Sequence, residues 1–183
     1  MLFRSAYGGS LANRGRFAAE IVSACRAATA KDFPISLRFS QWKVGNYDAK
    51  LVDTPQELEA LLAPVVSAGV SLFHSSARRF WESAFAGSDL TLSGWTKKVT
   101  GKPVISVGSV GLGGDYEPPM TATKIVPVGS LENLARIAER GEFDLIAVGR
   151  AMIVDPDWTR KVHEGRFSEL HAYDPAYQRD VYF

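Results

Sequence analysis

Two arginines and two glycines in this sequence are of types that could bind a ligand. They occur at Arg38 and in the pairs Gly108-Ser109 and Gly149-Arg150. Glycine lets a ligand approach the backbone closely, so the N–H groups of Gly108 and Gly149 can face a phosphate. Arg150 adds a permanent cation that can donate two parallel hydrogen bonds to such an anion. Glycines also suit ordinary turns, and spacing alone leaves the two interpretations equally open.

Arg38 lies in an alternating segment, residues 33–40. One side of this predicted strand carries apolar residues and the other polar ones: Ile35, Leu37 and Phe39 against Ser36, Arg38 and Ser40. A cation on a buried strand is costly unless an anionic or electron-rich group meets it. We therefore expect Arg38 to contact a ligand, with a structural ion pair as the alternative.

Other polar candidates give weaker signals. A lone histidine is more often a satisfied structural residue than a catalytic one, and we expect that role for His74. Residues 78–82 (RRFWE) predict either a mobile rim that touches substrate or a packed loop with charged edges, and the second is slightly favoured. The sequence has no Cys/His cluster with metal-ligand spacing, so we expect no metal, and no catalytic triad or carboxylate pair identifies catalytic residues.

These candidates follow or end four predicted strands, at residues 33–40, 70–74, 103–107 and 143–148. Helical patterns separate the strands. Thr54-Pro55-Gln56-Glu57 is a capping sequence that predicts a helix to about Ala68, and further helices are expected at 92–99, 130–141 and 155–165. Repeated strand-helix units form parallel sheets, whose carboxyl ends make the ligand face. Both glycine turns should therefore surround one anion.

The first predicted helix covers residues 13–30, with Ser10 as its cap. Its apolar stripe should be buried, which would place Cys25 in the core; the stripe contains Phe17, Ile21, Ala24, Cys25 and Ala28.

Composition favours a small-molecule partner. The chain has 183 residues, 46% hydrophobic and 22% charged, with a net charge of +1, which gives no reason to expect nucleic acid or an acidic membrane as partner. Without a long apolar run or a signal-peptide pattern, the cytoplasm is the expected compartment. We expect a single domain over residues 1–183, with an atypical or truncated start at residues 1–6.

Taken in order, several segments resemble the Old Yellow Enzyme family of NAD(P)H:flavin oxidoreductases. Residues 7–17 (YGGSLANRGRF) look like the signature before the fourth barrel helix, and residues 35–40 (ISLRFS) resemble the fifth strand. Residues 107–109 (VGS) and 148–157 (VGRAMIVDPD) resemble the ends of the seventh and eighth strands. The resemblance covers the chain from Tyr7 to about Tyr173.

The resemblance implies a (β/α)8 TIM barrel, represented here by strands five to eight as a partial barrel of about four parallel strands. It implies FMN as cofactor, NAD(P)H as reductant and activated alkenes such as enones as substrates, which is ene-reductase chemistry. Arg38 would contact the flavin ring, and Gly108, Ser109, Gly149 and Arg150 would hold the FMN phosphate. The family's first four strands, its His/His or His/Asn substrate pair and its tyrosine proton donor have no counterpart in this sequence.

Two alternatives remain at this stage. The chain is a non-catalytic half-barrel that binds phosphorylated ligands or self-associates through exposed sheet edges, or it is another phosphate-binding barrel enzyme without flavin.

Overall fold

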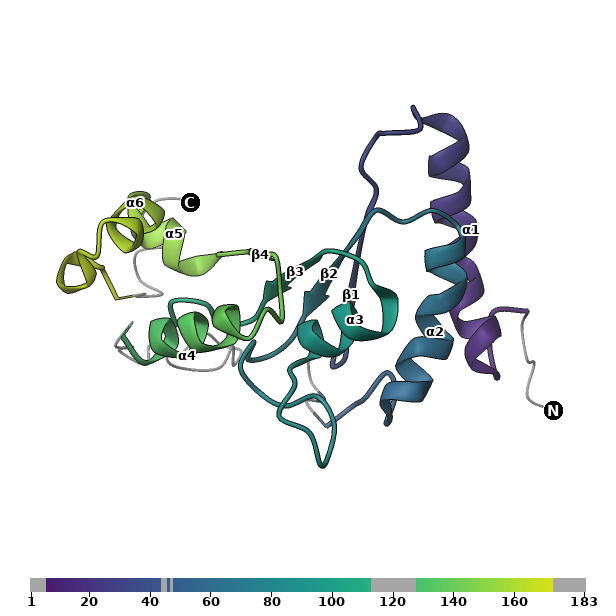
Figure 1. The fold of residues 1–183 in the computed structure, drawn as a ribbon, viewed down its shortest axis with the longest axis horizontal. Helices are drawn as coiled ribbons and strands as arrows, with labels where there is room; N and C mark the ends of the chain where they lie inside the picture. Colours follow the sequence, from purple (N-terminus) through teal and green to yellow (C-terminus); the bar gives the residue numbers. More distant parts are fainter. Residues whose placement is uncertain (1–5, 44–45, 47, 113–127, 173–183) are drawn as a thin grey trace.

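The computed structural model describes residues 6–43, 46, 48–112 and 128–172, and only the backbone of residues 128–130. These residues form a four-stranded parallel sheet in the order β1-β2-β3-β4, flanked by helices (Figure 1). Sequential strands are neighbours throughout, so each connecting segment returns to the next position along the sheet. This is the arrangement of consecutive units of an α/β barrel, as the sequence predicts.

The strands are β1 (Ser36–Ser40), β2 (Leu72–Ser76), β3 (Val104–Val107) and β4 (Leu145–Ile146). All four fall within or beside the predicted segments, but β4 is much shorter than residues 143–148. Leu37 and Phe39 pack against the hydrophobic core, whereas Arg38 between them is exposed. The expected alternation of β1 is therefore confirmed, and its polar residues share one face of the sheet with His74 and Ser76 of β2.

The helices are α1 (Leu11–Ala28), α2 (Pro55–Ser67), α3 (Leu92–Thr100), α4 (Val128–Glu139), α5 (Arg150–Val154) and α6 (Trp158–His163), followed by a 3-10 turn at Phe167–Glu169. Predicted caps account for where several of them begin. The Thr54 side chain accepts a hydrogen bond from the Glu57 N–H at 3.2 Å, and the Glu57 carboxylate accepts one from the Asp53 N–H at 2.8 Å. This arrangement resembles a capping box, except that the Glu57 carboxylate binds the N–H of Asp53 and not that of the cap residue Thr54.

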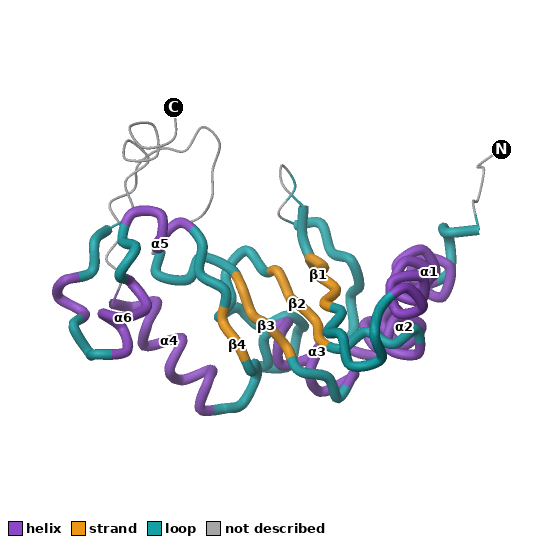
Figure 2. The backbone as a smooth tube through the Cα atoms, turned by 90° about the horizontal axis from the view of Figure 1, so that it is seen from above, coloured by secondary structure: helices purple, strands orange, loops and turns teal. Residues whose placement is uncertain are grey.

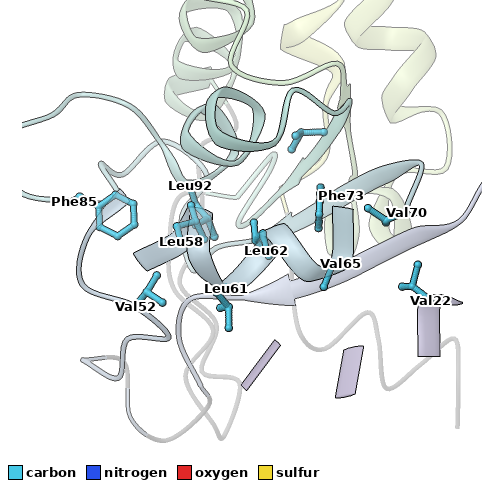
Figure 3. Packing of buried hydrophobic residues seen from close by; sticks show 11 residues of the cluster. Val22, Val52, Leu58, Leu61, Leu62, Val65, Val70, Phe73, Phe85 and Leu92 are labelled. Atoms are coloured by element: carbon cyan, nitrogen blue, oxygen red, sulfur yellow. The ribbon is translucent and has the colours of Figure 1, made fainter. Parts of the chain in front are cut away.

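The main core lies between the sheet and the helices α1, α2 and α3. Figure 3 shows its side chains converging from these elements, with Leu58 and Phe73 fully buried. Helix α2 contributes the four residues that its sequence pattern predicts: Leu58, Leu61, Leu62 and Val65. Buried hydroxyls join α3 to the sheet, because Ser93 donates to the Ser106 Oγ at 2.7 Å and Ser75 to the Thr96 Oγ1 at 3.2 Å.

Helices α4, α5 and α6 lie on the β4 side of the sheet (Figure 2), and they contribute to a second cluster of buried residues. It contains Phe80 from the segment after β2, Val110 and Leu112 from the segment after β3, and Ala151 and Trp158 from the C-terminal helices. The loops at the carboxyl ends of β2 and β3 are therefore packed against the helices that follow β4.

The predicted burial of α1 is wrong. Its buried residues are Gly15 and Val22, whereas Phe17 and Ile21 are 58% and 47% exposed and Cys25 is exposed. The reason is close packing against α2: a Cβ atom at Gly15 would lie 2.5 Å from the Leu61 carbonyl oxygen. Helix α1 therefore contacts α2 through Gly15, and the apolar stripe with Phe17 and Ile21 faces away from the described core.

Candidate functional site

Arg38 and His74 lie side by side on neighbouring strands, because the β1–β2 register pairs them. The Arg38 guanidinium reaches along the face and donates a hydrogen bond to the Ser76 Oγ at 3.2 Å. Arg38 is exposed, so the expected burial cost does not arise in the described residues. Its position is instead fixed by β2, because Ser76 holds the guanidinium at the carboxyl end of the sheet.

His74 differs from the expected satisfied histidine. Its Nε2 atom is buried and has no hydrogen-bond partner among the described residues. Burial is the main cause that lowers the pKa of His74 below its ordinary value of 6.5, and the neighbouring Arg38 cation lowers it further. The imidazole is therefore neutral at neutral pH, and its Nε2 has no partner in the part of the chain that the structure describes.

Gly108 ends β3 where two backbone segments meet. A Cβ atom there would lie 2.4 Å from the Ala77 carbonyl oxygen and 3.0 Å from the Phe80 nitrogen, at a φ of +153°. The Phe80 N–H donates to the Gly108 carbonyl at 3.1 Å. Only glycine suits this conformation and this close approach. The turn interpretation is therefore correct for Gly108, and it does not exclude a ligand on the other side of the loop.

Ser109 has a positive φ of 54°, which is uncommon for a residue with a side chain. Its hydroxyl donates to the Arg78 carbonyl at 3.0 Å, and its own carbonyl accepts from the Leu112 N–H at 3.1 Å. Strained conformations of this kind persist where surrounding contacts fix them, and they concentrate at functional sites.

Gly149 and Arg150 begin α5 without a side-chain cap. Apart from its chain neighbours, no described residue places a heavy atom within 4 Å of the position of a Cβ atom on Gly149. Uncapped first-turn N–H groups are donors for an anion. Arg150 itself is half-buried at the same turn.

The segments that follow β3 and β4 are in contact. A Cβ atom on Gly111, after β3, would lie 2.8 Å from the Ala151 Cβ in α5 and 3.0 Å from the Trp158 Nε1. Gly111 belongs to a glycine-rich run, residues 108–114 (GSVGLGG), which is weak evidence for a site by itself. The rest of that run, Gly113 and Gly114, lies outside the described residues.

A buried ion pair fixes the helices behind this turn. Lys161 donates to both Asp155 oxygens, at 2.9 and 2.8 Å, and to the Glu169 carbonyl at 3.0 Å. Burial acts to raise the pKa of Asp155 and is the largest single effect. Hydrogen bonds from Lys161 and the His171 N–H outweigh it and bring the pKa below 3.8. Asp155 follows α5 directly, so this pair positions the helix that Arg150 begins.

The segment after β2 is a packed loop with charged edges, the interpretation that the sequence slightly favours. Phe80 is 1% exposed in the second cluster, and Arg79 forms an ion pair with Glu82 at 3.0 Å. Within the described ranges, no group of three His, Cys, Asp or Glu side chains is placed to hold a metal ion, and no helix is long and apolar enough to cross a membrane.

A parallel sheet with helices between its strands, and with glycine turns and cations at its carboxyl ends, defines part of an α/β barrel. The family model described as NADH:flavin oxidoreductase / NADH oxidase matches residues 5–169. The chain therefore belongs to this family, in agreement with the resemblance in its sequence.

Curated relatives agree with this assignment. The chain is 34% identical to an NADH oxidase from Thermoanaerobacter brockii over 174 residues, which is 90% of this chain and 23% of that protein. It is 27% identical to a cinnamate reductase from Clostridium sporogenes, over 90% of this chain and 25% of the relative. The chain thus spans about a quarter of the length of these two relatives.

Solved structures show the same fold. An Old Yellow Enzyme homologue from Zymomonas mobilis superposes with a TM-score of 0.63 at 18% identity, covering 94% of this chain and 42% of the neighbour. A histamine dehydrogenase from a Rhizobium species gives a TM-score of 0.57 at 23% identity, covering 91% of this chain and 22% of the neighbour. The described fold is accordingly a partial TIM barrel of the Old Yellow Enzyme type.

Proposed function

We propose that this chain supplies part of the FMN site of an NAD(P)H oxidoreductase that reduces activated alkenes such as enones. The observation that carries the proposal is the contact between the turns after β3 and β4, beside the open and uncapped start of α5. FMN, when bound, supplies hydride transfer from NAD(P)H to the alkene. The protein binds and orients the cofactor.

The residues at these turns fit a phosphate. Gly149 leaves space beside the backbone, the first N–H groups of α5 are uncapped, and Arg150 stands at the same turn. Gly108 and Ser109 approach from β3 in a conformation fixed by Ala77, Phe80 and Arg78. We assign the FMN phosphate to this group of residues, with N–H donors and a guanidinium around one anion.

Arg38 is proposed to face the flavin ring. It stands on the polar face of β1, held by Ser76 and beside a neutral His74. A cation there stabilises negative charge on the electron-rich edge of a reduced ring. The neutral state of His74 matters because a second positive charge beside Arg38 would repel it.

The two relatives support this proposal: an NADH oxidase and a cinnamate reductase are both redox enzymes, and cinnamate contains an alkene conjugated to a carboxylate. Catalytic residues that protonate or bind the substrate are not assigned to this chain. We propose residues 1–183 as one domain, the C-terminal half of the barrel, which contributes to the cofactor site without a full catalytic set.

The test is a titration of the full chain with FMN and, separately, with riboflavin, following flavin fluorescence. Saturable FMN binding that is at least about tenfold tighter than riboflavin binding is expected, since charge-assisted hydrogen bonds to the phosphate contribute about 1.5–3 kcal/mol each. Equal affinities for the two flavins, or no binding by a chain whose circular dichroism shows it folded, would reject the phosphate assignment.

A second candidate is a half-barrel that associates with another copy. The outer strands β1 and β4 each have one neighbour among the described strands, and Phe17, Ile21 and Leu145 are large exposed apolar residues. Light scattering over a range of protein concentrations distinguishes the candidates: a mass that doubles with concentration favours association, and a constant monomer mass rejects it.

A further inference from the structure

Strand β2 lies between the two parts of the proposed flavin site. The sheet order is β1-β2-β3-β4, so β2 separates Arg38 on β1 from the turns that follow β3 and β4 (Figure 2). Neighbouring strands lie about 4.8 Å apart, and a ligand that reaches from Arg38 to these turns therefore passes over β2. In FMN, the group that joins the ring to the phosphate is the ribityl chain, a polyol. The polar groups of β2 on this face are the ones that its hydroxyls would meet.

His74 and Ser76 are the polar side chains that β2 carries on the same face of the sheet as Arg38. The β2–β3 register pairs them with Ile105 and Val107, which are both apolar. Along the described strands β2 and β3, His74 and Ser76 are therefore the only polar side chains on this face between Arg38 and the turn after β3.

Of these two residues, His74 is the one with a buried atom left unpaired. The Ser76 Oγ already accepts a hydrogen bond from the Arg38 guanidinium at 3.2 Å. The His74 Nε2 is buried and has no hydrogen-bond partner in the described part of the chain. An unpaired buried polar atom destabilises a fold, so a ligand that supplies the missing hydrogen bond is bound more tightly.

A hydroxyl group is the ligand chemistry that suits this nitrogen. One nitrogen of a neutral imidazole donates and the other accepts, and a hydroxyl does both, so it can pair with Nε2 in either tautomer. Burial, and then the Arg38 cation, lower the pKa of His74, and a neutral ring is a poor partner for a phosphate. His74 as a whole is only half-buried, and the torsion of its ring is broad and two-fold, so a half-turn moves Nε2 to the opposite ring edge.

We propose that His74 binds a ribityl hydroxyl of FMN through Nε2, between the flavin ring at Arg38 and the phosphate at the turns after β3 and β4. This inference rests on the proposed function, because it adds a binding residue to the same cofactor site. It gives β2 a role of its own, the recognition of the polyol chain, which is separate from the binding of the ring and of the phosphate.

The test titrates the full chain with FMN, with riboflavin, which lacks the phosphate, and with lumiflavin, which has a methyl group in place of the ribityl chain. Flavin fluorescence gives the dissociation constants. Riboflavin is expected to bind at least about fivefold more tightly than lumiflavin, because it can complete the hydrogen bonding of His74. His74→Leu should remove most of this preference. The preference for FMN over riboflavin should stay unchanged, because the phosphate is assigned to other residues.

His74→Gln and His163→Leu are the controls. The glutamine amide can donate or accept a hydrogen bond and should keep most of the preference for riboflavin over lumiflavin. His163 is an exposed histidine of α6, and its replacement should change none of the affinities. An unchanged preference in His74→Leu overturns the proposal. An equal loss in the leucine and glutamine variants also overturns it, because the shape of the ring and not its nitrogen would then matter.

A spectroscopic measurement on the original chain decides the question if His74→Leu does not fold. The sequence has 3 histidines, so variants of the exposed His163 and His171 identify by elimination the imidazole signals of His74 in a chain labelled with ¹⁵N-histidine. Saturation with FMN should shift the Nε2 signal of His74 more than those of the other histidines. A His74 signal that does not move while FMN binds overturns the proposal.

The same titrations separate this inference from the proposed function. If FMN binds more tightly than riboflavin and His74→Leu has no effect, the role of His74 alone is rejected. If no flavin binds to an original chain that circular dichroism shows to be folded, the cofactor site itself is rejected, and the polyol contact with it.

Discussion

The Ser109 hydroxyl donates a hydrogen bond to the Arg78 carbonyl at 3.0 Å and thereby joins the segments that follow β2 and β3. Close by, the Phe80 N–H donates to the Gly108 carbonyl at 3.1 Å. The turn assigned to the cofactor phosphate is thus fixed to the segment that follows β2.

Ser109 allows this link to be tested by two substitutions. Ser109→Ala removes the hydrogen bond and keeps the positive φ of 54°, so it should lower the free energy of unfolding by about 1–2 kcal/mol. Ser109→Gly also loses the hydrogen bond but relieves the backbone strain, and should cost less. Urea unfolding measures both. An alanine variant as stable as the original chain would show that the bond contributes nothing.

Gly108 and Gly149 should respond differently to alanine. At Gly108 the added Cβ would lie 2.4 Å from a backbone oxygen, so the substitution should cost more than about 2 kcal/mol of stability. At Gly149 the added methyl meets no described residue apart from the chain neighbours, and the loss of stability should be smaller than at Gly108. Thermal unfolding tests both expectations. If FMN affinity is unaffected in a folded Gly149→Ala chain, the phosphate does not lie against this residue.

His74 predicts a pH dependence of stability. Its pKa is below 6.5 in the folded chain, so the unfolded chain takes up a proton first as the pH falls. The contribution is therefore complete above about pH 6.5 and is lost as the pH falls through the folded pKa. His74→Gln should reduce the fall in Tm between about pH 7.5 and pH 5.5. The exposed His163→Gln variant is the control, and an equal fall in all three proteins would contradict the assignment.

Alanine substitutions at Leu58 and Phe17 compare the stability contributed by a buried and by an exposed apolar residue of the helices. Leu58 is fully buried and Phe17 is 58% exposed. Leu58→Ala should lower the free energy of unfolding by about 2–5 kcal/mol. Phe17→Ala should change it by less than about 0.5 kcal/mol in the monomer. Chemical unfolding at low protein concentration provides the measurement, and a large cost for Phe17→Ala would mean that α1 is buried in solution by an additional contact.

The parallel fold was predictable because periodicity and caps act locally. The Thr54 cap, the buried face of α2 and the alternation along β1 each depend on neighbouring residues, and each is confirmed. The orientation of α1 was not predictable, because an apolar stripe does not reveal which side a neighbouring helix will occupy. Close contact at Gly15 outweighs the larger apolar stripe of Phe17 and Ile21.

Within the site, the sequence predicted the positions of the glycine turns but not the contacts that they make. Gly108 is recognisable as a turn residue, but its contact with Ala77 depends on a segment that is distant in sequence. The contact between Gly111 and Ala151 has the same character. The sequence also could not predict that His74 Nε2 has no hydrogen-bond partner among the described residues. Whether a buried polar atom finds a partner depends on all the residues around it, including those distant in sequence.

The most direct test of the cofactor site compares FMN binding by the original chain, Arg150→Ala and the control Arg160→Ala. Flavin fluorescence quenching gives the three dissociation constants, and circular dichroism confirms that each chain is folded. The account predicts at least about a tenfold loss of FMN affinity for Arg150→Ala and none for Arg160→Ala. Unchanged affinity in a folded Arg150→Ala chain would contradict the assignment of the phosphate to the turns after β3 and β4.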